Sequence, residues 1–318
     1  MTTDAEPVGP AGDPGATSAL IAEIEAPPLP TVGSTGAVDV SAKRIRREQL
    51  HQLVRSKTFL VGFAILLWWV VCAIFGPLFV PYSPTGQDLL ATNAAPSAAH
   101  WFGTDSLGRD VLSRVIVGAR DILVIAPLAT LLGTALGTTI GLVQGYIGGP
   151  LDLVTGRIVD AALALPTVIV AFLFVVAIGP SKVTLVVVIG FVFGLLIART
   201  VRAAVLQERE LDYLAAARLR HESAPHVMFV EILPNVLGPV LVEFTVRLGY
   251  AIFTIATLSF LGFGVQPPTP DWGADIAANY QYLAAGYWWE TLFPALAIAS
   301  LVISINLIGD SIEAVVVQ

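Results

Sequence analysis

Residues 122–143 read ILVIAPLATLLGTALGTTIGLV and carry no charged side chain. A bilayer hydrocarbon core of about 30 Å needs about 20 apolar residues in helical form, because lipid offers the backbone no hydrogen-bond partner. The chain has further largely apolar runs, which are longer than barrel strands and do not alternate with period two. The sequence therefore predicts an all-α integral membrane protein with about six transmembrane helices. The other runs are residues 59–80, 161–179, 183–198, 236–264 and 291–309.

The composition agrees with a membrane protein. Of the 318 residues, 55% are hydrophobic and only 13% are charged, whereas about 25% of the residues of a typical soluble domain are charged. The formal net charge of −7 says little about partners, because charge in a membrane chain follows topology. The single cysteine, Cys72, excludes a disulfide within the chain and a cysteine-based metal cluster.

Three segments of different character divide the chain. Residues 1–42 are rich in Pro, Gly, Ala, Ser and Thr and lack Lys and Arg, which predicts a disordered cytoplasmic tail and not a signal peptide. Residues 43–121 should form the first transmembrane helix, an external loop and an interfacial helix. Residues 122–318 should form a five-helix core that contains a cytoplasmic loop at residues 199–235.

Lysines and arginines are placed unevenly along the chain. They gather in residues 43–57, before the first apolar run, and in residues 199–220, after the fourth, whereas residues 265–290 contain none. The cytoplasmic flanks of transmembrane helices carry the excess of Lys and Arg. Since an even number of spans leaves both termini on one side, the sequence predicts that both are cytoplasmic.

Glycines recur every four residues in the second apolar run, at Gly133, Gly137, Gly141 and Gly145. This spacing places them on one stripe of a helix, where a neighbouring backbone can approach closely. We expect a helix-packing surface there.

The loop at residues 199–235 reads RTVRAAVLQERELDYLAAARLRHESAPHVMFVEILPN and is too long for a simple turn between spans. Its apolar side chains recur at helical spacing, as at Leu206, Leu211, Leu214 and Ala215, which predicts a short helix with a narrow apolar face. Such a helix could present a docking surface to the cytoplasm. The alternative is an amphipathic helix that lies on the lipid surface.

This loop resembles the signature of the permease subunits of binding-protein-dependent ABC importers, in the dipeptide, oligopeptide and nickel group, and in particular their second, C-type permease. The family pattern is E-A-A, three residues, G, nine residues, I, one residue and L-P, and its helix inserts into a groove of the ATPase. The chain also fits the subgroup pattern D-Y-x-x-A-A-R. The residues that match the two patterns are Asp212, Tyr213, Ala216, Ala217, Arg218, Leu233 and Pro234.

Three positions of the chain depart from the family signature. Ala215 replaces the acidic residue, His221 replaces the glycine and Glu231 replaces an apolar residue. Histidine pays a steric cost at positive φ that glycine does not. We therefore expect the turn after the coupling helix to be formed differently around His221.

Two further stretches resemble the same subgroup. Residues 100–120, HWFGTDSLGRDVLSRVIVGAR, have the pattern of an amphipathic helix in the outer interface that enters the second span. Residues 258–273, LSFLGFGVQPPTPDWG, place a proline-rich turn outside the fifth span. Aromatic residues follow it and indicate either a membrane-interface belt or a contact with a substrate-binding protein. These are Trp272, Tyr280, Tyr282, Tyr287, Trp288 and Trp289.

Ionisable residues inside spans are costly and are functional candidates. Glu243 and Arg247 stand four residues apart, so one helix face can hold them as a pair. They either line an aqueous translocation path or form a structural ion pair. Asn306 and Asp310, which match the N-L-x-G-D pattern of the family, pose the same question.

The sequence has no G-x-x-x-x-G-K-[ST] phosphate loop, and none of its lysines follows a glycine. ATP and magnesium should therefore be bound by partner ATPase subunits, and this chain should have no cofactor of its own. The four histidines form no H-E-x-x-H zinc site, and the HESAPH stretch at residues 221–226 has no evident third ligand. We predict no metal site, no catalytic residue and no enzymatic activity.

The resemblance implies a type I ABC importer permease in a bacterial cell membrane. Its partners would be a second homologous permease, two ABC ATPase subunits, an extracytoplasmic peptide-binding protein and the lipid bilayer, with no nucleic acid. Its substrates would be dipeptides or oligopeptides, with nickel or another small solute as the alternative. A secondary transporter or channel is less favoured, because the chain shows no internal repeat with broken helices. A membrane enzyme is disfavoured, because no nucleophile, base and metal ligands cluster at one depth.

Overall fold

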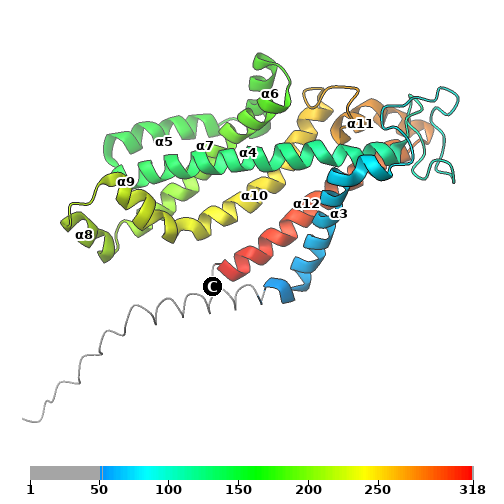
Figure 1. The fold of residues 1–318 in the computed structure, drawn as a ribbon. Helices are drawn as coiled ribbons and strands as arrows, with labels where there is room; N and C mark the ends of the chain where they lie inside the picture. The colour runs from blue at the N-terminus through cyan, green and yellow to red at the C-terminus, as the bar shows by residue number, and fades with distance from the viewer. Residues whose placement is uncertain (1–50, 52, 317–318) are drawn as a thin grey trace, which may run out of the picture. The chain divides into compact units, whose positions relative to one another are not determined.

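The computed structural model describes residue 51 and residues 53–316, so the predicted tail at residues 1–42 lies outside the described part. Regular structure in this part is helical, apart from one isolated bridge between Thr104 and Asp110 (Figure 1). The described helices include five that are long and apolar enough to cross a membrane. They are α3 (Lys57–Phe79), α4 (Val111–Ile147), α7 (Lys182–Glu208), α10 (Leu233–Phe260) and α12 (Trp289–Val316).

The predicted span at residues 161–179 is not one straight helix. The structure instead has α5 (Gly149–Leu163) and α6 (Thr167–Ile178), which meet at an angle of 88°. Pro166 causes the break, because proline lacks a backbone N–H and keeps the preceding residue out of the helical region. If the bent pair crosses the membrane as one span, the described chain has six spans, in agreement with the predicted fold class.

Helix α4 joins two elements that the sequence analysis separated. It begins at Val111, where the side chain of Asp110 accepts a hydrogen bond from the Ser113 N–H at 2.8 Å, and it continues for 37 residues. The predicted boundary at residue 121 therefore falls inside a continuous helix. At about 1.5 Å per residue, α4 is about 55 Å long, which exceeds the thickness of the hydrocarbon core.

The glycine stripe of α4 is a helix-packing surface, as the four-residue spacing predicts, and the structure shows that α7 packs against it. A Cβ atom at Gly137 would lie 2.5 Å from the carbonyl oxygen of Gly194, and one at Gly133 would lie 2.8 Å from that of Gly190. Side chains larger than hydrogen would therefore force the two helices apart.

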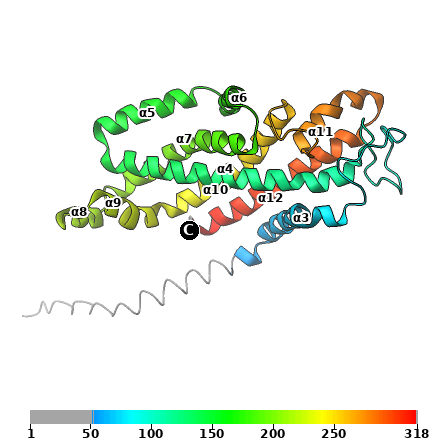
Figure 2. The same cartoon turned by 45° about the horizontal axis from the view of Figure 1, so that its top comes forward.

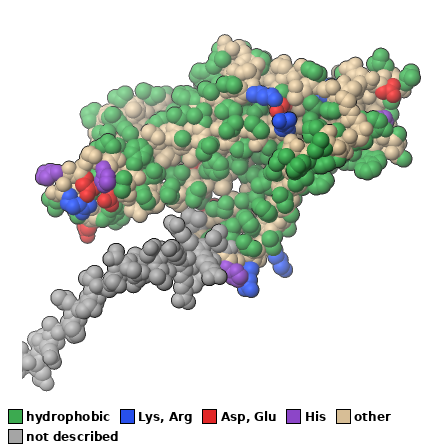
Figure 3. Space-filling view, viewed as in Figure 1, with side chains coloured by type: hydrophobic (Ala, Val, Ile, Leu, Met, Phe, Trp, Pro, Cys, Tyr) green, Lys and Arg blue, Asp and Glu red, His purple; other side chains and the backbone are tan. Residues whose placement is uncertain are grey.

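Short helices lie at the two ends of the long ones. Figures 1 and 2 show α8 (Asp212–Leu219) and α9 (Ala224–His226) at one end and α11 (Trp272–Asn279) at the other. A π-helix, η1 (Val227–Ile232), leads from α9 into α10, and a 3-10 helix, η2 (Tyr280–Ala285), follows α11. Figure 3 shows hydrophobic side chains over most of the long helices, with charged and histidine side chains gathered near α8.

Candidate functional site

Helix α8 is anchored through one face of its apolar side chains. Leu214 and Ala217 are fully buried, in a hydrophobic cluster that includes Val205 of α7 and Ile232 of η1. The sequence predicted the helix correctly but assigned its buried face only in part, because Ala215 and Leu211 are exposed. The buried face of α8 is therefore narrower than the apolar pattern indicates.

The opposite face of α8 is open and mostly apolar. Ala215 and Ala216 are exposed, and Leu211 and Leu219 are exposed by 47% and 81%. Two alanines in succession allow another protein to approach the helix backbone closely, and two leucines beside them offer apolar area to bury. We call this exposed face, made by these four residues, the docking face of α8, after the role that we propose for it.

Tyr213 ties α8 to both helices that flank the loop. Its hydroxyl donates a hydrogen bond to Oε2 of Glu208, at the end of α7, with a distance of 2.6 Å. The same hydroxyl accepts a hydrogen bond from Nδ2 of Asn235, at the start of α10, at 3.0 Å. Burial and the nearby carboxylate raise the pKa of Tyr213, so the hydroxyl keeps its proton. A displacement of α8 therefore acts directly on α7 and α10.

The turn after α8 corrects the expectation for His221. His221 adopts φ 55°, the left-handed conformation that glycine populates freely. The N–H of Glu222 then bonds to the carbonyl oxygen of Ala217 at 3.3 Å, which is the long-range hydrogen bond of a Schellman motif with His221 at its C′ position. The prediction of a differently formed turn is therefore wrong, because the backbone keeps the glycine-like conformation and histidine bears the strain.

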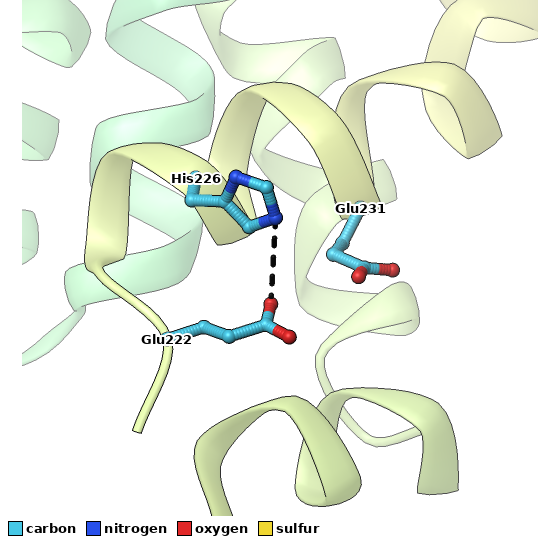
Figure 4. Close-up of side chains that lie close together, drawn as sticks. All are labelled: Glu222, His226 and Glu231. Carbon is cyan, nitrogen blue, oxygen red and sulfur yellow. Dashed lines mark ion pairs between the residues drawn. The ribbon is translucent and has the colours of Figure 1, made fainter. Parts of the chain in front are cut away.

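The other departure, Glu231, has a partner that the sequence did not reveal. Arg220 lies 2.7 Å from Oε1 of Glu222 and 3.6 Å from Oε1 of Glu231, so one guanidinium faces both carboxylates. Nε2 of His226 lies 3.7 Å from Oε2 of Glu222 (Figure 4). These four residues form an ion-pair network between the end of α8 and η1.

The same network corrects the prediction that the HESAPH stretch has no third ligand. Glu222, His226 and Glu231 bring one ligand atom each to within 4.8 Å of one another, which is a set that could hold a metal ion. Arg220 already neutralises both carboxylates, and a bound cation would have to displace it. The arrangement therefore fits a structural network better than a metal centre.

The ionisable residues of α10 form the pair that their spacing predicts. Nε of Arg247 donates to Oε2 of Glu243 at 2.8 Å, and the hydroxyl of Thr200, on α7, donates to Oε1 of Glu243 at 2.6 Å. The guanidinium carbon of Arg247 also lies 5.7 Å from the centre of the Tyr250 ring. Both charges are thus compensated inside the bundle, which lowers the cost of keeping them in the membrane.

Asn306 and Asp310 occupy an exposed strip of α12. A Cβ at Gly249 of α10 would lie 3.0 Å from Oδ1 of Asn306, and Gly309 packs near the Thr245 side chain. The side chain of Asp310 is exposed and has no ion-pair partner among the residues that the structure describes. The polar residues of α10 and α12 therefore lie along two helices that cross each other closely.

The end of the bundle opposite α8 contains buried charge pairs that sequence reasoning did not find. Nε of Arg114 donates to both carboxylate oxygens of Asp275, at 3.0 and 3.1 Å, and joins α4 to α11. Nε of Arg109 donates to Oδ2 of Asp105 at 2.6 Å. Arg114 and Asp275 are 161 positions apart, so no local pattern in the sequence could indicate their contact, whereas Asp105 and Arg109 are only four positions apart.

Two of the aromatic residues at this end have neither of the roles that the sequence suggested. Trp272 and Trp289 are buried, and their Nε1 atoms donate to the carbonyl oxygens of Val115 and Thr104 at 2.8 and 3.0 Å. Both are core residues, because their side chains are buried. A buried indole N–H needs a hydrogen-bond acceptor, and each finds one in the backbone. Trp288 remains half exposed.

Comparisons with known proteins agree on one family. Residues 137–318 match the family described as the binding-protein-dependent transport system inner membrane component, and residues 46–96 match the N-terminal transmembrane domain of oligopeptide transport permease C. A dipeptide transport system permease protein of Bacillus subtilis (strain 168) is 36% identical over 83% of this chain and 82% of its own length. One of Escherichia coli (strain K12) is 39% identical over 84% of this chain and 91% of its own length.

Two further comparisons extend this result. A di/tripeptide transport system permease protein of Pseudomonas aeruginosa is 38% identical over 84% of this chain. A chain of the inward-facing MetNI methionine ABC transporter matches the fold with a TM-score of 0.53, and the match covers 64% of this chain and 97% of that chain at 20% identity. That likeness concerns the fold alone.

Proposed function

This chain belongs to the family of binding-protein-dependent transport system inner membrane components, and we propose that it carries dipeptides and short oligopeptides across the membrane as one half of an importer's translocation pathway. It is a non-catalytic, multi-pass permease of the inner membrane, of the oligopeptide permease C type. The proposed substrate class follows the names of the relatives, which are dipeptide and di/tripeptide permeases. Nickel or another small solute is the alternative.

The docking face of α8 carries the proposal for the ATPase partner. Leu214 and Ala217 fix the helix to the bundle, while Ala216 and Leu219 face outward. The coupling role of Asp212, Ala216, Ala217 and Arg218, and of Leu233 and Pro234 at the start of α10, is part of the same proposal. Two ABC ATPase subunits would bind ATP and magnesium, and one would receive α8 in its groove.

Tyr213 gives this coupling a physical route. When ATP closes the ATPase dimer, α8 moves with its ATPase, and the hydrogen bonds of Tyr213 to Glu208 and Asn235 pull on α7 and α10 together. The same two helices are linked deeper in the bundle by Thr200 and Glu243. The two permeases of the importer would then tilt from an inward-facing to an outward-facing arrangement.

The pathway itself would be completed by a second homologous permease. We assign its wall in this chain to the polar residues on α10 and α12, which are Glu243, Arg247, Asn306 and Asp310. The Glu243–Arg247 ion pair is compensated within the chain, whereas exposed Asp310 is left for solvent or for the partner. An extracytoplasmic peptide-binding protein would deliver the substrate at the end that carries α11.

Orientation follows from the distribution of basic residues. The segment around α8 holds Arg199, Arg202, Arg209 and Arg220, which indicates the cytoplasmic side. At the other end, residues 265–290 contain no Lys or Arg. Both termini would be cytoplasmic.

Uptake of a labelled dipeptide tests the proposed function. Cells that lack this gene should take up little dipeptide, and the wild-type chain should restore uptake. A variant with Ala216→Pro, which removes a backbone N–H from the middle of α8, should insert in the membrane but fail to restore uptake. Ala216→Ser is the matched control. Restoration of nickel uptake without any restoration of dipeptide uptake would establish the alternative substrate.

A further inference from the structure

An apolar groove opens on the side of the bundle between α3, α4, α10 and α12. Its volume is about 550 Å³. Leu66 and Ile74 contribute from α3, Val124 from α4, Leu248 from α10 and Ile305 from α12. Ile74 and Val124 are exposed by 63% and 50%, so the groove is open along its side. It is separate from the docking face of α8, which lies at one end of the bundle (Figure 1).

One basic residue, Arg120, stands among the apolar residues that line the groove. It is exposed and has no carboxylate partner among the residues that the structure describes. The neighbouring carboxylate, Asp121, is engaged elsewhere, because Nζ of Lys182 lies 2.6 Å from its Oδ1. The groove therefore combines an apolar wall with an unpaired positive charge.

The position of Arg120 along the helices fixes the depth of the groove. Lys182 begins α7, so the Asp121–Lys182 pair marks the level at which α7 ends on the side away from α8. Ile74 lies near the corresponding end of α3, and Leu66 lies eight residues deeper, which is about 12 Å along a helix. The groove thus runs from the edge of the hydrocarbon core to about its middle, since half of the core is about 15 Å.

We propose that this groove binds an anionic phospholipid, with one acyl chain along the apolar wall and the phosphate on Arg120. An acyl chain of one leaflet extends from the headgroup level to the bilayer centre, as the groove does. A guanidinium at the headgroup level binds a phosphate through charge-assisted hydrogen bonds. In the proposed orientation the lipid belongs to the outer leaflet.

Other occupants match the groove less well. A zwitterionic peptide would bring its ammonium group to a groove with no carboxylate among the residues that line it. An apolar helix of the second permease would cover the wall but would leave Arg120 unpaired at the hydrocarbon boundary, at a cost in free energy. A phospholipid covers the apolar wall with its acyl chain and pairs its phosphate with Arg120.

Native mass spectrometry of the purified full-length chain tests the proposal. The chain is mixed with palmitoyl-oleoyl phosphatidylglycerol or palmitoyl-oleoyl phosphatidylcholine in mild detergent, and retained lipid is measured. The wild type should retain phosphatidylglycerol at least threefold better than phosphatidylcholine. Arg120→Gln should lose this preference, and Val70→Trp, which narrows the groove without changing charge, should retain less of both lipids.

Arg157→Gln is the matched control, because it removes one exposed positive charge outside the groove and leaves the Asp121–Lys182 pair intact. It should keep the preference of the wild type. Equal loss in Arg157→Gln and Arg120→Gln, or no difference between the lipids in the wild type, would overturn the proposal.

A photoreactive residue at the exposed position Val124 distinguishes the occupants in native membranes. Crosslinking to phospholipid is the expected result, whereas crosslinking to the second permease or to a labelled dipeptide would contradict it. None of these measurements depends on transport, so a failure here leaves the proposed peptide uptake untouched.

Discussion

The hydroxyl of Tyr213 donates a hydrogen bond to the carboxylate of Glu208 across 2.6 Å and so fastens the exposed helix α8 to the end of α7. Asn235 completes the link from the side of α10. These bonds add to the apolar anchor of α8, in which only Leu214 and Ala217 are fully buried. The link gives α8 a mechanical connection to both flanking spans.

Tyr213→Phe should uncouple α8 from the bundle. It removes both hydrogen bonds and leaves the half-buried Glu208 carboxylate without the hydroxyl, at a cost of about 1–3 kcal/mol. We expect dipeptide uptake to fall several-fold in cells while the amount of inserted chain stays near normal. Tyr82→Phe, which removes an exposed hydroxyl bonded to the Ala99 carbonyl at the opposite end, is the control. Equal uptake by the two variants would contradict the coupling route.

His221→Gly should stabilise the protein. The left-handed conformation costs a residue with a Cβ about 1–2 kcal/mol, and glycine avoids most of that cost. The midpoint of thermal unfolding, measured in detergent, should rise. His221→Ala removes the imidazole but keeps the Cβ, and it should not raise the midpoint. If both variants raised it, the imidazole and not the backbone would be the cause.

Glu290→Gln should also raise the thermal midpoint. Glu290 is 1% exposed, and neither of its carboxylate oxygens has a hydrogen-bond partner among the described residues. Glutamine keeps the side-chain shape and avoids the cost of ionising a buried carboxyl group that has no partner, so the substitution should be stabilising. Glu313→Gln changes an exposed carboxylate of the same helix and is the control, with no shift expected. A lower midpoint for Glu290→Gln would contradict this prediction and indicate that the carboxyl group has a partner outside this chain.

Asp271 should make stability fall as pH rises. Burial raises the pKa of Asp271 to about 6, from an ordinary value of 3.8. Between these values the folded chain binds the proton more tightly than the unfolded chain, so stability decreases with rising pH up to about 6 and is then level.

Asp271→Asn should flatten this part of the pH profile, because it removes the titratable carboxyl group. The helix cap should survive, since the amide oxygen can still accept the Ala274 N–H at the start of α11. Thermal midpoints from pH 4 to pH 7 measure the effect. Asp271→Ala should instead destabilise at every pH, since it removes the cap as well as the charge. An unchanged slope in Asp271→Asn would assign the pH dependence to another group.

Much of the architecture could be predicted from local patterns. The apolar runs identified the long helices, the glycine spacing identified a packing surface on α4, and the helical spacing of apolar residues indicated α8. The prediction of one span at residues 161–179 was wrong in shape, because apolarity alone does not distinguish a straight span from two helices that meet at 88°. Pro166, inside this run, was the sequence signal for the break.

The site was less predictable, because its essential contacts are not local. Asn235 meets Tyr213 from 22 positions away, and Glu231 meets Arg220 across a turn whose shape depends on His221. The burial of Trp272 likewise depends on Val115, 157 positions earlier. Periodicity reports which face of a helix is apolar, but not which distant residue will cover it.

Site-directed crosslinking at Ala216 tests the central claim, that α8 docks on an ATPase, most directly. The position is exposed, and the one native cysteine, Cys72, is buried, so Ala216→Cys should provide the accessible thiol. In native membranes a bifunctional thiol reagent should join Ala216→Cys to an ATPase subunit, and ATP should change the yield. A cysteine at Thr139, an exposed position of α4 away from the loop, is the control and should give no such product. Dipeptide uptake by Ala216→Cys with no crosslink to any ATPase would contradict the account.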